Sequence, residues 1–202
     1  MTEDEARDWA AARLDGPAII RLEHLADLVR AESPRQNLVA RSTLGSIWTR
    51  HIVDSLQLLP FAPDGAWLDI GTGAGFPGLA VAAAEPERPI WLIEPRRLRA
   101  EFLHASASTL GLRHVTVLAS KVESISHPAK VISARAVSRV GALLASAVHC
   151  ARNETIWLLP KGRGAREEVA EARQSWHGMF HVEQSITDPE SAIVIARGVR
   201  AR

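Results

Sequence analysis

Cysteine is nearly absent from this sequence, which also has few lysines and no long apolar run. A single cysteine, Cys150, excludes a disulfide within the chain and is typical of a reducing compartment. No apolar segment approaches the roughly 20 residues that a transmembrane helix needs. Residues Thr2 to Glu5 are polar and acidic, unlike the start of a secretory signal. These absences predict a cytoplasmic protein without a membrane anchor.

Patterns for metal binding are missing as well. The 8 histidines have no metal-ligand spacing, and the lone cysteine has no second thiol beside it, so we expect no metal. The net charge is only +1, and of the 24 basic residues 3 are lysines, namely Lys121, Lys130 and Lys161. A nucleic-acid site on this chain would therefore be a local patch of basic side chains and not a general property of the surface.

The size of the chain indicates one globular unit with an appendage. Its 202 residues are 47% hydrophobic and 23% charged, which is too short a chain for two full domains. Pro60, Pro63 and Gly65 separate a helical extension, residues 1–64, from a core over residues 65–202. Within the extension, apolar residues at helical spacing predict helices over 2–14, 18–31 and 43–59, with Ser33-Pro34 ending the second.

In the core, apolar runs alternate with helical segments, which predicts a parallel sheet covered by helices on both faces. We expect strands at 66–70, 90–94, 115–118, 130–134 and 155–159. We expect helices at 77–84, 96–110, 138–150 and 164–175. Two later runs, Phe180 to Ile186 and Ser191 to Arg197, are close enough for an antiparallel hairpin. The prediction is an α/β, Rossmann-like fold with a mostly parallel seven-stranded sheet, and five of the tryptophans are expected to pack in its core: Trp48, Trp67, Trp91, Trp157 and Trp176.

A glycine-rich segment, DIGTGAGFPG over residues 69–78, follows the first expected strand. Glycines let the backbone turn sharply and approach a ligand closely. Pro77 suits the first turn of a helix, and the free N–H groups of a helix start favour a nucleotide-like ligand. The pattern is G-x-G-x-G, because Phe76 stands where the dinucleotide motif requires its third glycine. The segment therefore predicts a cofactor cradle that does not hold a conventional dinucleotide.

An acidic residue, Glu94, ends the next apolar run, 21 residues after Gly73. In a parallel sheet such a carboxylate lies at the tip of the neighbouring strand, where it can accept hydrogen bonds from ribose hydroxyls. A ribose binder beside a cradle without a pyrophosphate turn favours S-adenosylmethionine, and hence a class I methyltransferase. The alternative is that the glycines only tighten a turn and that Glu94 caps a strand in solvent.

Several motifs, in the same order along residues 37–162, resemble the bacterial 16S rRNA guanine-N7 methyltransferases, the glucose-inhibited division protein B family. The motifs are Asn37-Leu38, Arg50-His51-Ile52-x-Asp54-Ser55, the loop from Asp69 to Gly78, Phe102-Leu103, Lys121-Val122-Glu123, Arg135-Ala136 and Pro160-Lys161-Gly162. The resemblance implies methyl transfer from S-adenosylmethionine to one guanine of 16S rRNA, either naked or in the 30S subunit, by a protein that we expect to be a monomer.

The cofactor candidates combine the loop with positions that the resemblance implies. They are Asp69, Gly71, Thr72, Gly73, Gly75, Phe76, Glu94, Val122, Glu123 and Arg135. The RNA candidates are basic or polar residues at the expected mouth of the site: Asn37, Arg50, His51, Arg139 and Lys161. For some of them a structural role is the alternative. Arg50 and Asp54 could form an ion pair along one helix, Lys161 could be a solvated turn lysine, and Asn37 could cap a turn.

The expected chemistry needs little from side chains. Guanine N7 carries an in-plane lone pair and needs no deprotonation, and a methyl sulfonium is an activated donor, so alignment for in-line displacement is the main requirement. We therefore expect no general base and no certain catalytic residue, with Arg135 and Lys161 as candidates for positioning. Two other functions stay open: a small-molecule methyltransferase, and a non-catalytic protein that binds rRNA during assembly.

Overall fold

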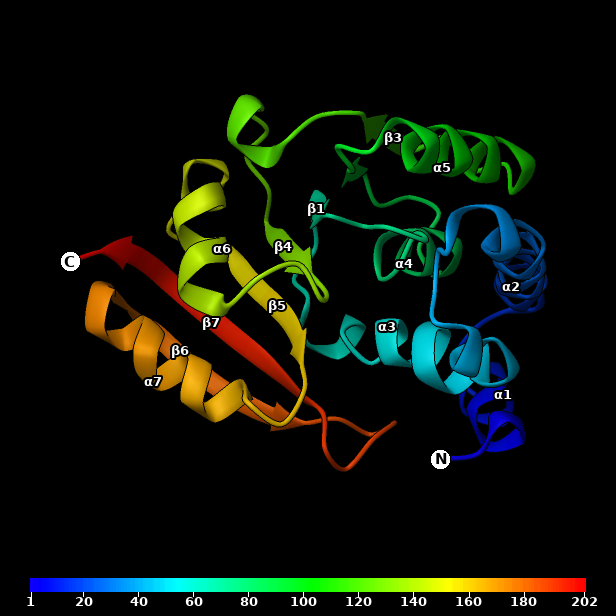
Figure 1. Ribbon diagram of the computed structural model, residues 1–202, viewed down its shortest axis with the longest axis horizontal. Coiled ribbons are helices and arrows are strands. Elements are labelled where there is room, and N and C mark those ends of the chain that lie inside the picture. Colours follow the sequence, from blue (N-terminus) through cyan, green and yellow to red (C-terminus); the bar gives the residue numbers. More distant parts are fainter.

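The computed structural model describes residues 1–202 and has a seven-stranded sheet at its centre (Figure 1). The strand order is β3-β2-β1-β4-β5-β7-β6. Five strands run parallel: β1 (Trp67–Ile70), β2 (Ile90–Ile93), β3 (Val115–Leu118), β4 (Val131–Ala134) and β5 (Ile156–Lys161). The hairpin β6 (Trp176–Gln184) and β7 (Ala192–Ala201) joins β5 in antiparallel pairing. The predicted Rossmann-like fold is confirmed, and the strand order reverses between β1 and β4, where such sheets bind ligands.

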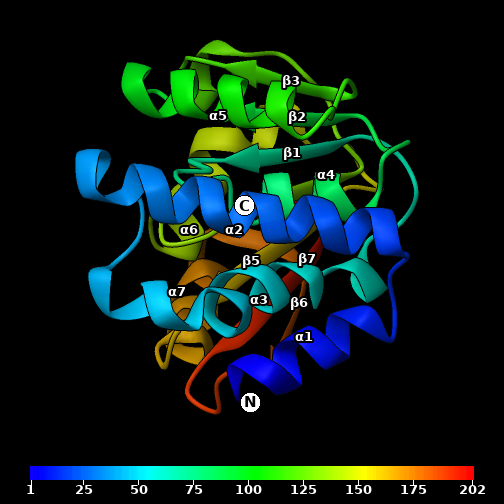
Figure 2. The same ribbon diagram turned by 90° about the vertical axis from the view of Figure 1, so that its right-hand side faces the viewer.

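Helices cover both faces of this sheet. Three of them, α2 (Gly16–Gln36), α4 (Gly78–Ala84) and α5 (Arg97–Thr109), belong to one hydrophobic core, and Figure 2 shows α2 lying across α4. The helices α6 (Val140–Ala147) and α7 (Ala165–Ser175) pack on the opposite face in a second core. Because β1 is enclosed by both layers, all four of its residues are buried, as expected for a central parallel strand.

The five tryptophans pack in or against the core, as predicted. Trp48, Trp67 and Trp157 are fully buried and Trp176 is buried at the edge of the second core. Trp91, on β2, is half-buried and packs against the second core, with its ring centroid 4.8 Å from that of His127.

The first two N-terminal helices are present as predicted, but α1 (Glu3–Ala11) ends earlier than residue 14 and α2 is longer at both ends than 18–31. Helix α1 begins with the expected capping box between Thr2 and Glu5. Helix α2 continues to Gln36 instead of ending at Ser33-Pro34. A proline in the last turn removes one backbone hydrogen bond, and the buried apolar face of α2, which includes Leu25 and Val29, holds the helix against that loss.

The single helix predicted over 43–59 is wrong. The structure has a 3₁₀ helix η1 (Arg41–Ser46), a π-helical segment η2 (Trp48–Val53), the short α3 (Asp54–Leu56) and a 3₁₀ turn η3 (Leu59–Phe61). A π turn adds a residue per turn and is often found at functional sites. Tertiary contacts decide this irregular winding, since Arg135 from β4 binds the carbonyl of Arg50 within it.

The helix predicted over 138–150 and the two strands of the hairpin also differ in length from the prediction. The helix expected over 138–150 is α6 followed by the 3₁₀ turn η5 (Val148–Cys150), and another 3₁₀ turn, η4 (Val122–Ser124), follows β3. The hairpin strands are longer than predicted, because β6 begins directly at the end of α7. Exposed, polar residues on this edge strand weaken the alternation that identifies strands. No helix combines the length and apolarity needed to cross a bilayer.

Candidate active site

The glycine loop, defined as Gly71–Phe76, leaves β1 at the point where the strand order reverses. Gly71 has a φ of +63° and Gly75 a φ of +94°, in the region that residues with a Cβ rarely adopt. A Cβ at Gly75 would lie 2.5 Å from Cδ1 of Leu79, and one at Gly71 would lie 2.7 Å from Cγ2 of Val137. Glycine is therefore required at both positions by backbone conformation and by close packing.

Asp69 lies beneath this loop with no exposed surface. Its Oδ2 accepts a hydrogen bond of 2.9 Å from the N–H of Gly78 at the start of α4, and its Oδ1 accepts one of 2.6 Å from the Ser133 hydroxyl. Asp69 is one of the predicted cofactor residues, and the structure gives its buried carboxylate two protein partners that support the loop.

Burial raises the pKa of Asp69 from 3.8 to about 6, against the opposing effect of its hydrogen bonds from Ser133 and Gly78. The folded protein therefore holds a proton on Asp69 between these pH values when the unfolded chain does not. Stability is lost as the pH rises through this window, by about 3 kcal/mol in total.

We expect the stability advantage of the wild type over Asp69→Asn to fall as well, by about 2 kcal/mol between pH 4 and pH 7. Urea unfolding at the two pH values measures it. Asp64→Asn, at an exposed position, is the control. A difference that is constant with pH would show that Asp69 titrates normally.

Glu94 connects the tip of β2 to the glycine loop. Its Oε2 accepts a hydrogen bond of 3.1 Å from the Gly73 N–H, and its Oε1 accepts one of 2.9 Å from the Arg96 N–H. The residue is only 3% exposed, so it is not a strand cap in solvent. Each carboxylate oxygen has further acceptor capacity, which is what a ribose-binding role requires.

Beside the loop is a crevice of about 400 Å³ at the carboxyl ends of the strands. It contains three of the cofactor candidates, Gly71, Val122 and Glu123. The other lining residues are Ile70, Ile93, Pro95, Lys121, Val137, Ser138, Ala142 and Ser146. We call this the loop crevice. Glu94 lies between two of its lining residues, Ile93 and Pro95, whereas Thr72, Gly75 and Phe76 are buried in the loop itself.

A second cleft, of about 690 Å³, adjoins the loop crevice. Of the residues predicted for the RNA side and for positioning, it gathers Arg50, His51, Arg135, Arg139 and Lys161. We call it the basic cleft. The two clefts share Val137 and Ser138 in their walls, so the segment after β4 separates them.

Asn37 is the RNA candidate that does not line the basic cleft, although its neighbours Leu38 and Val39 do. Its φ is +50°, and its N–H donates to the Ser33 carbonyl at 2.9 Å, so it caps α2. Asn37 was considered either as an RNA contact or as a cap, and its contacts in the structure are those of a helix cap.

Arg135 organises one wall of the basic cleft. Its guanidinium donates to the Arg50 carbonyl at 3.0 Å, to Asp54 at 3.2 Å and to Nδ1 of His51 at 2.9 Å. It also lies over the Phe76 ring, 5.4 Å from the centroid. These contacts use three of the five N–H donors of the guanidinium, and through them Arg135 joins the end of β4 to η2 and Asp54.

The expected ion pair between Arg50 and Asp54 does not form. Arg50 pairs with Asp188 in the β6–β7 turn, and Asp54 accepts from Arg135 and, at 3.0 Å, from the Thr187 hydroxyl of the same turn. The π winding of η2 directs the two side chains apart, and each finds a partner far away in the sequence.

His51 is buried in this wall and stacks on Phe76, with ring centroids 5.2 Å apart. Because arginine can only donate, Nδ1 of His51 accepts from Arg135, and Nε2 carries the proton toward the Thr43 hydroxyl at 2.9 Å. Burial, together with the charges of Arg135 and Arg50, lowers the pKa of His51 to about 3. His51 is therefore neutral at neutral pH and cannot serve there as a cation for phosphate.

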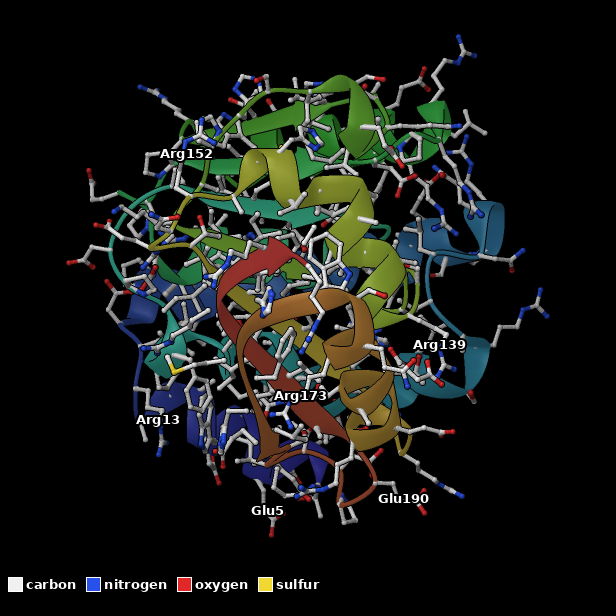
Figure 3. All side chains as sticks on the ribbon, turned by 90° about the vertical axis from the view of Figure 1, so that its left-hand side faces the viewer. Glu5, Arg13, Arg139, Arg152, Arg173 and Glu190 are labelled. Carbon is white, nitrogen blue, oxygen red and sulfur yellow. The ribbon has the colours of Figure 1, made fainter.

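The side chain of Lys161 is held by two protein partners. Its ammonium pairs with Glu168 at 2.9 Å and donates to the Ser138 carbonyl, and its side chain is only 10% exposed. It is thus not a solvated turn lysine. Arg139, in contrast, lies on the surface (Figure 3), where it pairs with Glu171 at 2.6 Å.

Glu168, Thr187, Val137 and Ser138 take part in this site and were not predicted. Nothing in their local sequence marks them, because each acquires its role from a partner on another element. No group of three histidine, cysteine, aspartate or glutamate side chains is placed to hold a metal ion.

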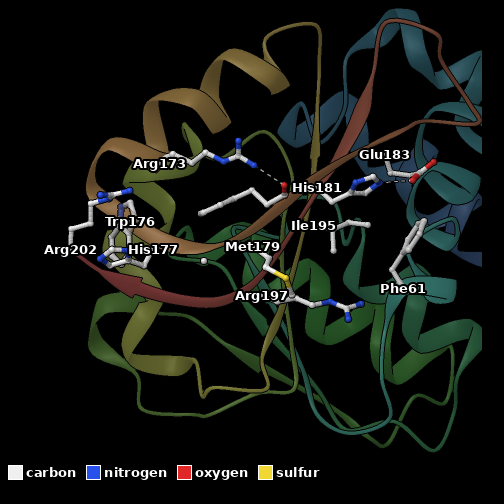
Figure 4. A pocket seen from close by; sticks show the side chains of 12 residues that line it. Phe61, Arg173, Trp176, His177, Met179, His181, Glu183, Ile195, Arg197 and Arg202 are labelled. Atoms are coloured by element: carbon white, nitrogen blue, oxygen red, sulfur yellow. Dashed lines mark hydrogen bonds and ion pairs between the residues drawn. The ribbon is translucent and has the colours of Figure 1, made fainter.

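A larger cleft, of about 780 Å³, lies elsewhere, over the outer end of the β6–β7 hairpin (Figure 4). Its lining includes Phe61, Met179 and Arg197, and no predicted site residue reaches it. In Figure 4, Arg173 donates to the Phe180 carbonyl and His181 contacts Glu183. Size alone therefore does not identify the site, since Gly71 and the predicted basic residues line the other two clefts.

Comparison with known proteins identifies the family of this chain. The family described as "GidB: rRNA small subunit methyltransferase G" matches residues 19–193. The ribosomal RNA small subunit methyltransferase G of Novosphingobium aromaticivorans is 48% identical over 98% of this chain and 89% of its own. The protein of the same name from Zymomonas mobilis is 40% identical over 100% of this chain and 96% of its own.

Solved structures with low sequence identity share the fold. A mutant of MtNAS in complex with S-adenosylmethionine has a TM-score of 0.57 at 15% identity, over 88% of this chain and 71% of that one. A putative rRNA methylase from Clostridium thermocellum has a TM-score of 0.54 at 13% identity, over 71% of this chain and 92% of that one. At these identities the likeness concerns the fold alone.

Proposed function

Because the chain belongs to the rRNA small subunit methyltransferase G family, we propose that it methylates N7 of a guanine in 16S rRNA with S-adenosylmethionine as the donor. The observation that supports this most is the pair of adjoining clefts. One lies against the glycine loop and its carboxylate, the other carries the arginines, and both use Val137 and Ser138 as a common wall. A donor in one cleft and an acceptor in the other would approach each other past the edge of this wall.

In this proposal the loop crevice holds the cofactor. Gly71 lines it without a side chain, Glu94 at the tip of β2 accepts the ribose hydroxyls, and Val122 with Glu123 forms another part of its wall. A crevice of about 400 Å³ with a glycine in its wall, beside the loop that Glu94 binds, fits an adenosine that carries an amino acid. When bound, S-adenosylmethionine supplies an activated methyl sulfonium.

The residues of the basic cleft would orient the guanine so that only its N7 faces the methyl group. Guanine N7 needs no base to remove a proton, and His51, which is neutral and hydrogen-bonded on both nitrogens, has a structural role. In-line displacement then depends on alignment of the N7 lone pair with the methyl group, for which fixed walls are sufficient.

Arg50 and Arg139 are the cleft residues best placed to contact RNA phosphates. Their side chains are 45% and 56% exposed, and each pairs with one carboxylate, Asp188 and Glu171 respectively. Exposed ion pairs of this kind contribute about 1 kcal/mol or less. Exchanging the carboxylate for a phosphate would therefore cost little, whereas Lys161 and Arg135 would each have to leave a largely buried partner.

Glu94→Gln is expected to weaken S-adenosylmethionine binding about tenfold to 100-fold. Hydrogen bonds to a charged group contribute about 1.5–3 kcal/mol, and the amide also loses one of the two backbone N–H groups that the carboxylate accepts. Calorimetric titration measures the affinity. Glu101→Gln, at an exposed position on the following helix, is the control. Equal affinity of wild type and Glu94→Gln would remove Glu94 from the cofactor site.

Methyl transfer with labelled S-adenosylmethionine tests the function as a whole, with 30S subunits, intact 16S rRNA and free guanosine as acceptors. Label in RNA that maps to an N7-methylguanine, where reduction and aniline treatment cleave the chain, supports the proposal. Label in guanosine but not in RNA supports a small-molecule methyltransferase. RNA binding without transfer of label supports a non-catalytic assembly protein.

A further inference from the structure

Between the loop crevice and the basic cleft lies the segment Ala136–Ser138, which we call the partition. We propose that Lys161 and Glu168 are positioning residues that hold the partition in place for methyl transfer, and that Lys161 is not a ligand of RNA phosphate. This inference rests on the proposed function and extends it to residues on β5 and α7.

The partition is held from both of its ends. Lys161 donates to the Ser138 carbonyl and pairs with Glu168 at 2.9 Å. Glu168 also accepts a hydrogen bond of 2.9 Å from the Val140 N–H, at the start of α6. On the other end, Arg135 is bound to η2. Lys161 and Glu168 therefore tie the chain after the partition to β5 and α7, while Arg135 ties the chain before it to η2.

The conformation of the partition requires such support. Ala136 has a φ of +55°, which is unfavourable for a residue with a Cβ. Strained residues of this kind persist only where surrounding contacts determine the backbone. Here the contacts fall on both sides of Ala136, at Arg135 and at Ser138.

The partition also touches the glycine loop directly. A methyl group of Val137 lies only 2.7 Å from the place that a Cβ of Gly71 would take, so Val137 packs against a bare α-carbon. Val137 and Ser138 line both clefts. Movement of the partition would thus change the shape of the donor and acceptor sites together, and misplacement by about 1 Å can cost about 100-fold in rate.

The geometry disfavours the alternative, in which Lys161 binds a phosphate. Its ammonium is already occupied by a carbonyl and a carboxylate, and the side chain of Glu168 is only 17% exposed. A phosphate approaching Lys161 would meet the negative charge of Glu168, and moving Lys161 to it would leave that carboxylate largely buried without its partner.

Glu168→Gln separates the two roles because they predict opposite results. If Glu168 and Lys161 position the partition, kcat for RNA methylation falls about tenfold or more, while KM for RNA stays unchanged. If Lys161 binds phosphate, removal of a neighbouring carboxylate leaves kcat unchanged and tightens RNA binding. Steady-state kinetics on 30S subunits or 16S rRNA, whichever the wild type methylates, distinguishes these outcomes.

Two variants of Lys161 complete the test. Lys161→Met is expected to lower kcat like Glu168→Gln, with no change in the salt dependence of RNA binding. A lost phosphate contact would instead reduce the slope of log K against log salt by about 0.7 to 0.9, and that result would overturn the inference. Lys161→Arg retains the charge and a donor for Ser138, so it should recover most of the kcat lost in Lys161→Met.

Glu154→Gln is the matched control, since it breaks an exposed lysine–glutamate pair with Lys130 before the opposite end of β5. Its kcat should equal that of the wild type. Urea unfolding of each variant identifies any loss of folding. If the wild type itself transfers no label to RNA, the proposed function fails. If the wild type is active and Glu168→Gln, Lys161→Met and Lys161→Arg all keep its kcat, only the present inference fails.

Discussion

Acidification from pH 6.5 to pH 3 is expected to remove about 4 kcal/mol of folding stability through His51 alone. The pKa of His51 is lowered from 6.5 to about 3 by burial and by the charges of Arg135 and Arg50. Between these pH values the unfolded chain binds a proton at His51 and the folded protein does not. Stability is therefore fully present above pH 6.5 and is lost as the pH falls toward 3.

His51→Asn isolates this effect. The asparagine oxygen can accept from Arg135 as Nδ1 does, but the side chain does not titrate. We expect the wild type to be the more stable protein at pH 7 and its advantage to shrink by about 3 kcal/mol between pH 7 and pH 4, in urea unfolding experiments. The wild type and the variant have to be compared because titration of Asp69 raises stability as the pH falls over part of the same pH range.

His104→Asn is the control, since His104 is exposed on α5. If the stability difference between wild type and His51→Asn does not change with pH, the pKa of His51 is the same in the folded and unfolded states, and His51 is protonated in the folded protein at pH 4. Its contact with Arg135 would then require a different arrangement of donors.

Arg135→Ala is expected to destabilise the protein by about 3 kcal/mol or more. Removing one partner of a largely buried ion pair costs about 3–5 kcal/mol, and here Asp54 is only 15% exposed. The same substitution leaves the Arg50 carbonyl and Nδ1 of His51 without their donor. The sequence marks Arg135 as a candidate for cofactor binding and positioning, and its contacts predict a contribution to folding stability as well.

Urea unfolding of Arg135→Ala, Asp54→Asn and the double variant measures this coupling. Because the two residues share one interaction, the double variant should lose less than the sum of the single ones. Arg113→Ala, at an exposed position, should be neutral. Unchanged stability of Arg135→Ala together with weaker cofactor binding would show that the guanidinium serves a ligand and not the fold.

Local patterns were sufficient for much of the sheet. The strand at 115–118 was predicted to the residue, and the other parallel strands were located to within two residues at either end. Enclosed parallel strands are continuous apolar runs, which are visible without knowledge of their neighbours. The glycine loop and Glu94 were recognisable for a similar reason, because backbone conformation restricts which residues can occupy such a turn.

The residues from 41 to 61 were not predictable in the same way. Their apolar spacing fits one regular helix, yet the chain forms two 3₁₀ helices, a π turn and a short α-helix. Arg135 and Asp188, which hold this segment, are 85 and 138 residues away from Arg50. Spacing along a helix cannot reveal partners of this kind.

By itself, then, the sequence determined the α/β sheet, the glycine turn after β1 and the carboxylate after β2, because these depend on residues that are neighbours along the chain. Only the tertiary structure decided which polar side chains are free for a ligand and which hold the walls of the site. Asp69, Arg135 and Lys161 belong to the second group, since each is buried against partners on other elements. Burial makes an unpaired charge costly, so the partner that folding supplies, and not the residue type, determines what each of these side chains does.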